Sequence, residues 1–106
     1  MSLDLENQIV DTWNINNRIN LYLLEAIPPG ALNDASASKG RTVAQQLAHL
    51  HNVRLMRGFK PHITAFLGYV DAHESHHRGQ IALSLKQSGH TLDKKVAYGI
   101  WEWGVR

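Results

Sequence analysis

Two histidines, His73 and His77, stand four residues apart in the segment His73-Glu74-Ser75-His76-His77. On a helix, side chains with this spacing lie on one face, about 5–6 Å apart. Two neutral imidazole nitrogens placed in this way can bind one divalent metal ion at about 2.0–2.1 Å each. The spacing therefore predicts part of a metal site, and a further ligand has to come from another element of the fold.

The segment lies within a stretch that predicts a long helix from about Pro61 to Ser88, ending at Gly89. One face of this helix is apolar except for the two histidines. The predicted stripe consists of Ile63, Phe66, Val70, His73, His77, Ile81 and Ser84. His62 shares that face, but it is three turns before His73, about 16 Å along the axis, so it is excluded from the same site.

A second helix is predicted from Thr42 to about Met56 or Arg57, because Thr42 and Gln45 form a capping box. At 100° per residue, His49 falls inside the apolar arc of this helix, whereas His51 falls beyond its edge. We therefore expect His49 to face the core and His51 to lie nearer solvent. His49 is the third predicted metal ligand.

A first helix is predicted from about Leu3 to Ile27 and ends at Pro28-Pro29-Gly30. Its apolar stripe carries two asparagines, Asn16 and Asn20, in the middle. A short helix, Lys94 to about Trp103, is predicted near the C-terminus, with Asp93 as its cap and with Gly99 weakening it. The sequence predicts one domain, residues 1–106, of the all-α class: an antiparallel bundle of three long helices plus a short C-terminal helix.

Composition limits the classes of partner. The net charge is only +2, and the eleven Lys and Arg residues are scattered, so nucleic acid is not an expected partner. The chain has no cysteine, so a metal has to be bound by nitrogen and oxygen ligands. The N-terminal residues lack the features of a signal peptide, and no apolar run approaches the ~20 residues that span a bilayer. We expect a cytoplasmic protein that does not contact membranes.

Three protein nitrogens leave at least one coordination position open, as in catalytic metal sites. The segment also matches the zinc peptidase motif H-E-x-x-H. The extended form of that motif fails, because Gln80 and Leu83 stand where it requires glycine and a third histidine. We therefore do not expect a peptidase. We interpret Glu74 as a solvated helix residue in preference to an outer-shell donor, and His76 as a surface or outer-shell residue.

Two segments resemble the DinB-like family, which was named for damage-inducible proteins. They are Gln46-Leu47-Ala48-His49-Leu50 and the run from His73 through Arg78-Gly79-Gln80-Ile81, followed by Gly89. The resemblance implies an up–down–down–up four-helix bundle that often dimerises. It also implies a divalent metal ion, variously nickel, zinc or iron, bound by His49, His73 and His77. Some relatives are metal-dependent transferases or isomerases that use low-molecular-weight thiols.

The chain departs from the family at one place. Relatives have another helix between the two histidine-bearing helices, whereas here Met56-Arg57-Gly58-Phe59 makes that passage in a few residues. The bundle would then leave a groove open, and exposed apolar surface of that size needs a partner. We therefore expect a homodimer, with exchange of helices as one way to close the bundle.

Three hypotheses follow. The first is a metal-dependent transferase acting with a small-molecule thiol, in which Asn16, Gln80 or His76 orients the bound ligand. The second is a non-catalytic, dimeric metal-binding protein with a stress or scaffold role. The third is a helical bundle in which the histidines are hydrogen-bonded core residues without a metal.

Overall fold

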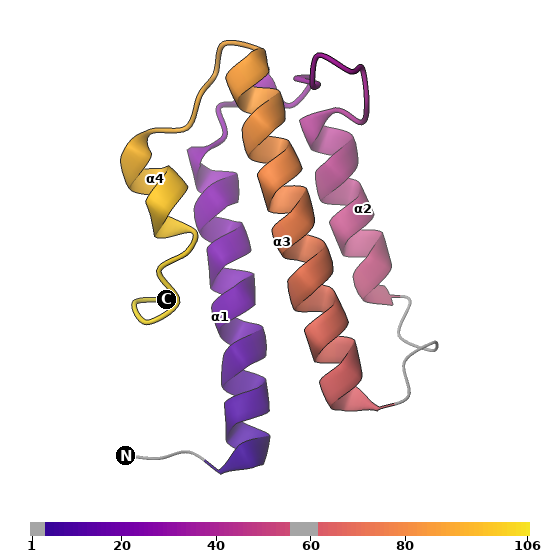
Figure 1. Ribbon diagram of the computed structural model, residues 1–106, viewed down its shortest axis with the longest axis vertical. Helices are drawn as coiled ribbons and strands as arrows, with labels where there is room; N and C mark the ends of the chain where they lie inside the picture. The colour runs from indigo at the N-terminus through magenta and orange to yellow at the C-terminus, as the bar shows by residue number, and fades with distance from the viewer. Residues whose placement is uncertain (1–3, 56–61) are drawn as a thin grey trace.

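The computed structural model describes residues 4–55 and 62–106. Three long helices are present, α1 (Leu5–Ala26), α2 (Val43–Leu55) and α3 (Ile63–Gln87). A short 3-10 turn, η1 (Pro29–Ala31), follows α1, and a short helix, α4 (Lys94–Gly99), follows α3. Successive long helices run in opposite directions, α3 packs against both α1 and α2, and α4 packs against the far side of α1 (Figure 1). The predicted all-α class is confirmed, and no strand occurs in the two described ranges.

The helix starts follow local capping chemistry. The carboxylate of Asp4 accepts a hydrogen bond from the backbone N–H of Asn7 at 2.8 Å. The predicted capping box at the start of α2 is confirmed, because Thr42 Oγ1 accepts from the N–H of Gln45 and the Gln45 side chain accepts from the N–H of Thr42. Both arrangements satisfy N–H groups that the first turn of a helix leaves without partners.

The start of α3 differs from the sequence prediction. The described helix begins at Ile63, and Pro61 lies outside the described residues. His62 is the N-cap, and its Nδ1 accepts a hydrogen bond from the backbone N–H of Ala65 at 3.1 Å. His62 was therefore wrongly placed on the helical stripe, because it is the N-cap and its ring accepts from one free N–H group of the first turn, that of Ala65. Ile63 is 68% exposed, so its predicted place on the buried stripe is also wrong.

The main core lies where α1, α3 and the segments around them meet. It is formed by Ile19, Leu23, Ile27, Ala31, Val43, Ile81, Leu85 and Ile100. The buried face of α3 is wider than the predicted stripe, since it also includes Leu67, Glu74 and Arg78. The reason is that α3 has a neighbour on each of two sides, so residues 100° away from the predicted stripe are buried as well.

The C-terminal helix is shorter than predicted, because α4 ends at Gly99 and not near Trp103. Asp93 occupies the N-cap position but makes no side-chain capping bond. A Cβ on Gly99 would lie 2.6 Å from the ring of Tyr22 on α1. Gly99 therefore allows the close approach of α4 to α1, which is a packing role that its low helix propensity did not indicate.

The passage from α2 to α3, predicted to be short at Met56-Arg57-Gly58-Phe59, lies within the residues that are not described, 56–61. The predicted end of α2 at Met56 or Arg57 also falls there, and the described part of α2 ends at Leu55. None of the described helices combines the length and apolar character that crossing a bilayer requires.

Candidate metal centre

The three predicted ligands lie together. His49 projects from α2, and His73 and His77 project from successive turns of α3, so the packing of α2 on α3 brings the rings into one group, which we call the histidine cluster. The Nε2 atoms of His49 and His73 are 3.1 Å apart. The three ring centroids are separated by 4.5 to 4.9 Å, and one nitrogen from each ring lies within 4.8 Å of the others.

The neighbouring histidines are outside this cluster. His51 on α2 is exposed, as predicted. His76 on α3 is also exposed, and its ring centroid is 5.1 Å from that of His77. His77 is buried, whereas His49 and His73 are half-buried. His77 is therefore the most buried of the three rings, and the other two are partly accessible to solvent.

The electrostatic environment keeps two of the rings neutral. Burial, together with the neighbouring His73 and His49, lowers the pKa of His77 to about 4, against the opposing effect of a hydrogen bond with Gln80. Burial and His49 also lower the pKa of His73. A neutral imidazole keeps one nitrogen lone pair available, which is the form that binds a metal.

The cluster fits a divalent transition metal. Two nitrogens that each lie about 2.0–2.1 Å from one ion in a tetrahedral site are about 3.3 Å apart, close to the 3.1 Å between His49 and His73. Nδ1 of His73 is buried and has no hydrogen-bond partner among the described residues, so hydrogen bonding alone does not satisfy this ring. Oε1 of Gln46 lies 3.2 Å from Nδ1 of His77, which fixes the orientation of that ring as outer-shell partners of metal ligands do.

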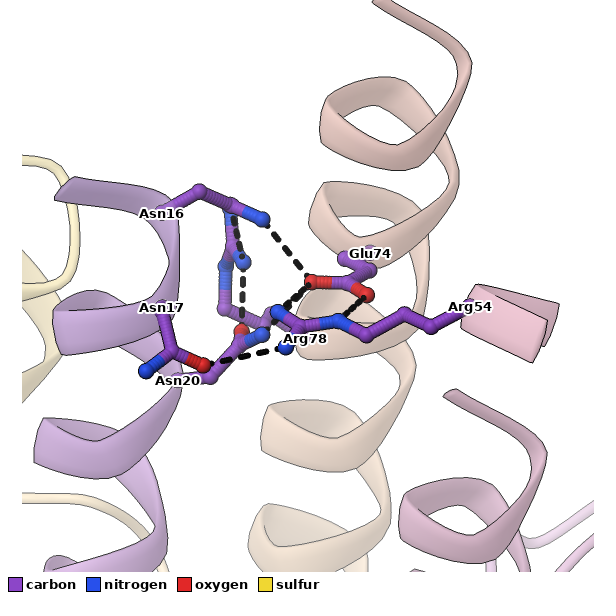
Figure 2. A network of polar contacts seen from close by, with 6 residues as sticks. All are labelled: Asn16, Asn17, Asn20, Arg54, Glu74 and Arg78. Carbon is purple, nitrogen blue, oxygen red and sulfur yellow. Dashed lines mark hydrogen bonds and ion pairs between the residues drawn. The ribbon is translucent and has the colours of Figure 1, made fainter. Parts of the chain in front are cut away.

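Next to the cluster is a set of polar side chains that joins α1, α2 and α3. We call it the polar network (Figure 2), and it consists of Asn16, Asn17, Asn20, Arg54, Glu74 and Arg78. Glu74 is at its centre. Its carboxylate accepts two hydrogen bonds from Arg54, at 2.6 and 2.8 Å, one from Asn16 at 2.8 Å and one from Asn20 at 2.6 Å.

Asn16 and Asn20 connect the negatively charged Glu74 with the positively charged Arg78. Asn16 and Asn20 each donate from Nδ2 to Glu74, and each accepts from Nη1 of Arg78 on the side-chain oxygen. An amide side chain can do this because it carries a donor and an acceptor on two separate atoms. Arg54 completes the set by donating to Asn17 at 3.0 Å and by lying 4.8 Å from the centre of the Trp13 ring.

Glu74 was interpreted as a solvated residue, and this interpretation is wrong, because the residue is 1% exposed. Burial alone would raise its pKa, but the hydrogen bonds from Arg54, Asn20 and Asn16 and the charge of Arg54 lower it. Asn16, which was predicted as one of three residues that could orient a bound ligand, uses both polar atoms of its amide within the network. Two sequence features could have indicated the network. Asn16 and Asn20 are four residues apart on one helix, and Glu74 and Arg78 are four residues apart on another.

The geometry also argues against peptidase chemistry. In the motif H-E-x-x-H, the glutamate serves as general base and the second histidine as ligand. Here His73 and His77 have the spacing of that motif, but four hydrogen bonds occupy the carboxylate of Glu74, so it is not free to act as a general base.

A pocket of about 230 Å³ lies between the loop after η1 and the helices α2 and α3, and none of the three cluster histidines is among its lining residues. Gln46 and Gln80 form part of its wall, and Gln46 contacts His77. Arg41 and the hydroxyls of Ser36 and Ser38 line it from the loop. We call this space the loop pocket. It places Gln80, which was predicted to orient a bound ligand, beside the cluster.

Comparison with known sequences supports the interpretation of this region. The sequence model of the DinB family matches residues 58–99. Residues 58–99 are thus similar to the DinB family. The matched residues include His73, Glu74, His77 and Arg78. They begin after α2, so His49 is not among them. The packing of α2 on α3 brings His49 to His73 and His77. Comparison of the full sequence with curated proteins and with solved structures gave no significant match.

Proposed function

We propose that His49, His73 and His77 bind one divalent transition metal ion, and that the protein is a metal-dependent transferase that uses a low-molecular-weight thiol. The observation that supports the metal site is the group of three ring nitrogens, from two helices, within 4.8 Å of one another. Imidazole nitrogen is a good ligand for zinc, nickel and iron, and a poor one for magnesium or calcium.

The transferase part of the proposal rests on the partial exposure of His49 and His73 and on the similarity of residues 58–99 to the DinB family. Three histidines leave a coordination position for a substrate. A bound divalent ion lowers the pKa of a coordinated thiol, which then is a nucleophile at neutral pH. The residues of the chain have two tasks: Gln46 holds the ring of His77, and the loop pocket, with Gln80 in its wall, accepts the molecule that reaches the site.

The alternative is a non-catalytic metal-binding protein. This alternative is favoured by the position of the cluster between α2 and α3, since an ion bound there would also hold the two helices together. The two functions differ in the coordination sphere. In a transferase, the metal keeps one coordination position for water or thiol. In a structural site, protein ligands occupy every position, and chelation of the metal destabilises the fold.

Metal binding is tested first. Protein purified without an affinity tag is analysed for bound elements and then titrated, after chelation, with zinc, nickel and iron(II). We expect about one ion per cluster in the wild type and loss of tight binding in His49→Ala and His73→Ala. The matched controls are His51→Ala on α2 and His76→Ala on α3, both exposed, which should bind as the wild type does. Equal affinity in the cluster variants and the controls would contradict the proposed ligand set.

Thiol chemistry is tested on the loaded protein. Addition of a small thiol to the cobalt(II)-substituted form should produce a thiolate-to-metal absorption band, and His73→Ala should lose both the band and the transfer of thiol to an electrophile. Stoichiometric metal together with an absent band, and no transfer across a panel of thiols and electrophiles, would favour the non-catalytic alternative.

We also propose that the protein forms a homodimer. The support is a set of large apolar side chains that are exposed on α1 and in the C-terminal part of the chain. They include Leu21 at 48%, Leu24 at 44%, Tyr98 at 71% and Trp101 at 66% exposure. Trp103, in contrast, packs against the core. Surface of this kind is commonly covered by a second subunit, and the molar mass in solution tests the proposal.

A further inference from the structure

The loop pocket contains side chains that the metal site itself does not use. Its wall on the loop side is formed by Ser36, Ser38 and Arg41, and its wall on the helix side includes Gln46 and Gln80. Among its described lining residues there is one cation and no acidic side chain. Its volume of about 230 Å³ lies below the roughly 300–1,000 Å³ of pockets for drug-sized ligands, so it suits a small molecule.

Arg41 is available to a ligand. It makes no hydrogen bond or ion pair with any other residue that the structure describes. A guanidinium group offers several N–H donors in one plane, and it binds a carboxylate through two parallel hydrogen bonds. An unpaired arginine in the wall of a pocket therefore favours an anionic group in that pocket over a neutral or cationic one.

The two serines add donors of the same kind. The hydroxyls of Ser36 and Ser38 lie 2.7 Å apart and form one hydrogen bond. A hydroxyl that accepts this bond keeps its own hydrogen for another acceptor. The serine pair and Arg41 thus present donors, and an oxyanion is the acceptor that would satisfy them together.

The loop that carries these residues is held in place by helix contacts. The backbone N–H of Ala37 donates to Oε1 of Gln87 on α3 at 2.6 Å, and the hydroxyl of Ser88 donates to the carbonyl of Ala35 at 3.1 Å. The N–H of Val43, at the start of α2, donates to the carbonyl of Asp34 at 2.8 Å. These bonds order the pocket wall before a ligand arrives, which lowers the entropic cost of binding.

Two residues of the pocket wall, Gln46 and Gln80, hydrogen-bond to His77 of the histidine cluster. Gln46, which is 3% exposed, lines the pocket and contacts His77, and Gln80 follows His77 by one turn of α3. We propose that the loop pocket binds the carboxylate group of a small anionic thiol, through Arg41 and the serine pair, while the thiol group of the same molecule faces the histidine cluster. This inference rests on the proposed function, because it names the class of thiol that the site accepts.

The test compares matched thiols on the cobalt(II)-loaded, full-length protein. Mercaptopropionate and mercaptohexanoate carry a carboxylate, and mercaptopropanol and mercaptohexanol are their neutral counterparts. Binding is followed by the thiolate-to-metal absorption band. For at least one chain length, we expect the carboxylate thiol to bind roughly tenfold or more tightly than the alcohol, the change that one hydrogen bond to a charged group produces.

Arg41→Gln should remove this preference and leave the affinity for the neutral thiols unchanged. Lys39→Asn is the matched control, because it removes the same charge from the same loop at a residue outside the pocket wall, and asparagine tolerates the positive φ of 61° at this position. An equal effect of Lys39→Asn would overturn the direct contact of the carboxylate with Arg41.

A second measurement tests anion binding in the pocket independently of metal binding. Propionate, which has no thiol, is titrated into the metal-free protein, and backbone amide shifts are followed by NMR. We expect shifts confined to residues 36–41 and the adjoining part of α3, and their loss in Arg41→Gln. Normal thiolate bands with no carboxylate preference would overturn the pocket proposal alone. Absent bands with intact propionate shifts would overturn the thiol function and keep the anion site.

Discussion

Replacement of Glu74 by glutamine should weaken the fold strongly, although the two side chains have the same shape. In Glu74→Gln, the side-chain oxygen can still accept from Asn16, from Asn20 and from one Arg54 nitrogen. The new amide group then lies where Oε2 now accepts from Nε of Arg54 at 2.6 Å, so two donors face each other. Arg54 also loses the only carboxylate with which it forms an ion pair among the described residues.

The magnitude follows from these contacts. A lost hydrogen bond between charged groups costs roughly 1.5–3 kcal/mol, and breaking a buried ion pair costs roughly 3–5 kcal/mol. Arg54 is 22% exposed and can recover part of its hydration, so the lower end of the second range applies. We expect a loss of about 3 kcal/mol, which for a domain of this size lowers Tm by about 10–20 °C.

Urea denaturation followed by far-UV circular dichroism measures this loss, with Glu25→Gln, at an exposed position on α1, as the matched control. The control should change the free energy of unfolding by less than about 0.5 kcal/mol. A change in Glu74→Gln as small as that of the control would refute the reasoning, because it would mean that the buried carboxylate contributes nothing net.

The same variant makes a prediction about pH. The pKa of Glu74 in the folded protein is lowered, so its carboxylate stabilises the fold fully above the ordinary glutamate value of about 4.3. That contribution is lost as the pH falls from this value through the lowered one. The difference in stability between wild type and Glu74→Gln should therefore be constant near neutral pH and shrink in acid. The charge of Glu74 acts to raise the pKa of His73, so the comparison is made with His73→Ala in both proteins, which removes this coupled titration from the difference.

Three further predictions concern other elements. Asn16→Asp puts a second carboxylate against the network and should cost about 2–4 kcal/mol, whereas Asn14→Asp, at an exposed position of the same helix, should cost under about 0.5 kcal/mol by the same denaturation assay. Gly99→Ala should lower Tm, because its Cβ meets a tyrosine ring, and Gly68→Ala, with open space around it in α3, should raise stability by about 0.5–1 kcal/mol. Light scattering should give a dimer mass that Trp101→Ser shifts toward monomer; a monomeric wild type contradicts the proposed dimer.

The histidine cluster could be predicted from sequence because its members obey helical periodicity within their own helices. His73 and His77 repeat after four residues, and His49 falls in the apolar arc of α2, so each could be assigned to a buried face before the helices were placed. The capping box at Thr42 is equally local, because both of its hydrogen bonds join residues three positions apart.

The surroundings of Glu74 could not be predicted in this way, because its partners come from distant parts of the chain. Asn16 is 58 residues away, and Arg54 is 20 residues away on a different helix. Periodicity within α3 places Glu74 beside the predicted stripe, and only the position of α1 decides whether that flank is buried. The need for glycine at position 99 has the same origin, because the side chain that leaves no room for a Cβ there belongs to Tyr22, 77 positions earlier in the chain.

Helix α1 provides no ligand to the histidine cluster, yet it helps to position the cluster through the polar network. Asn16 and Asn20 contact both Glu74 and Arg78, which lie one turn apart on α3, so they oppose rotation of α3 about its axis. Arg54 joins α2 to the same carboxylate. The rotation of α3 and its distance from α2 are the two quantities that determine how closely His73 and His77 approach His49. A network variant that still folds should therefore lose metal affinity even though every histidine is present.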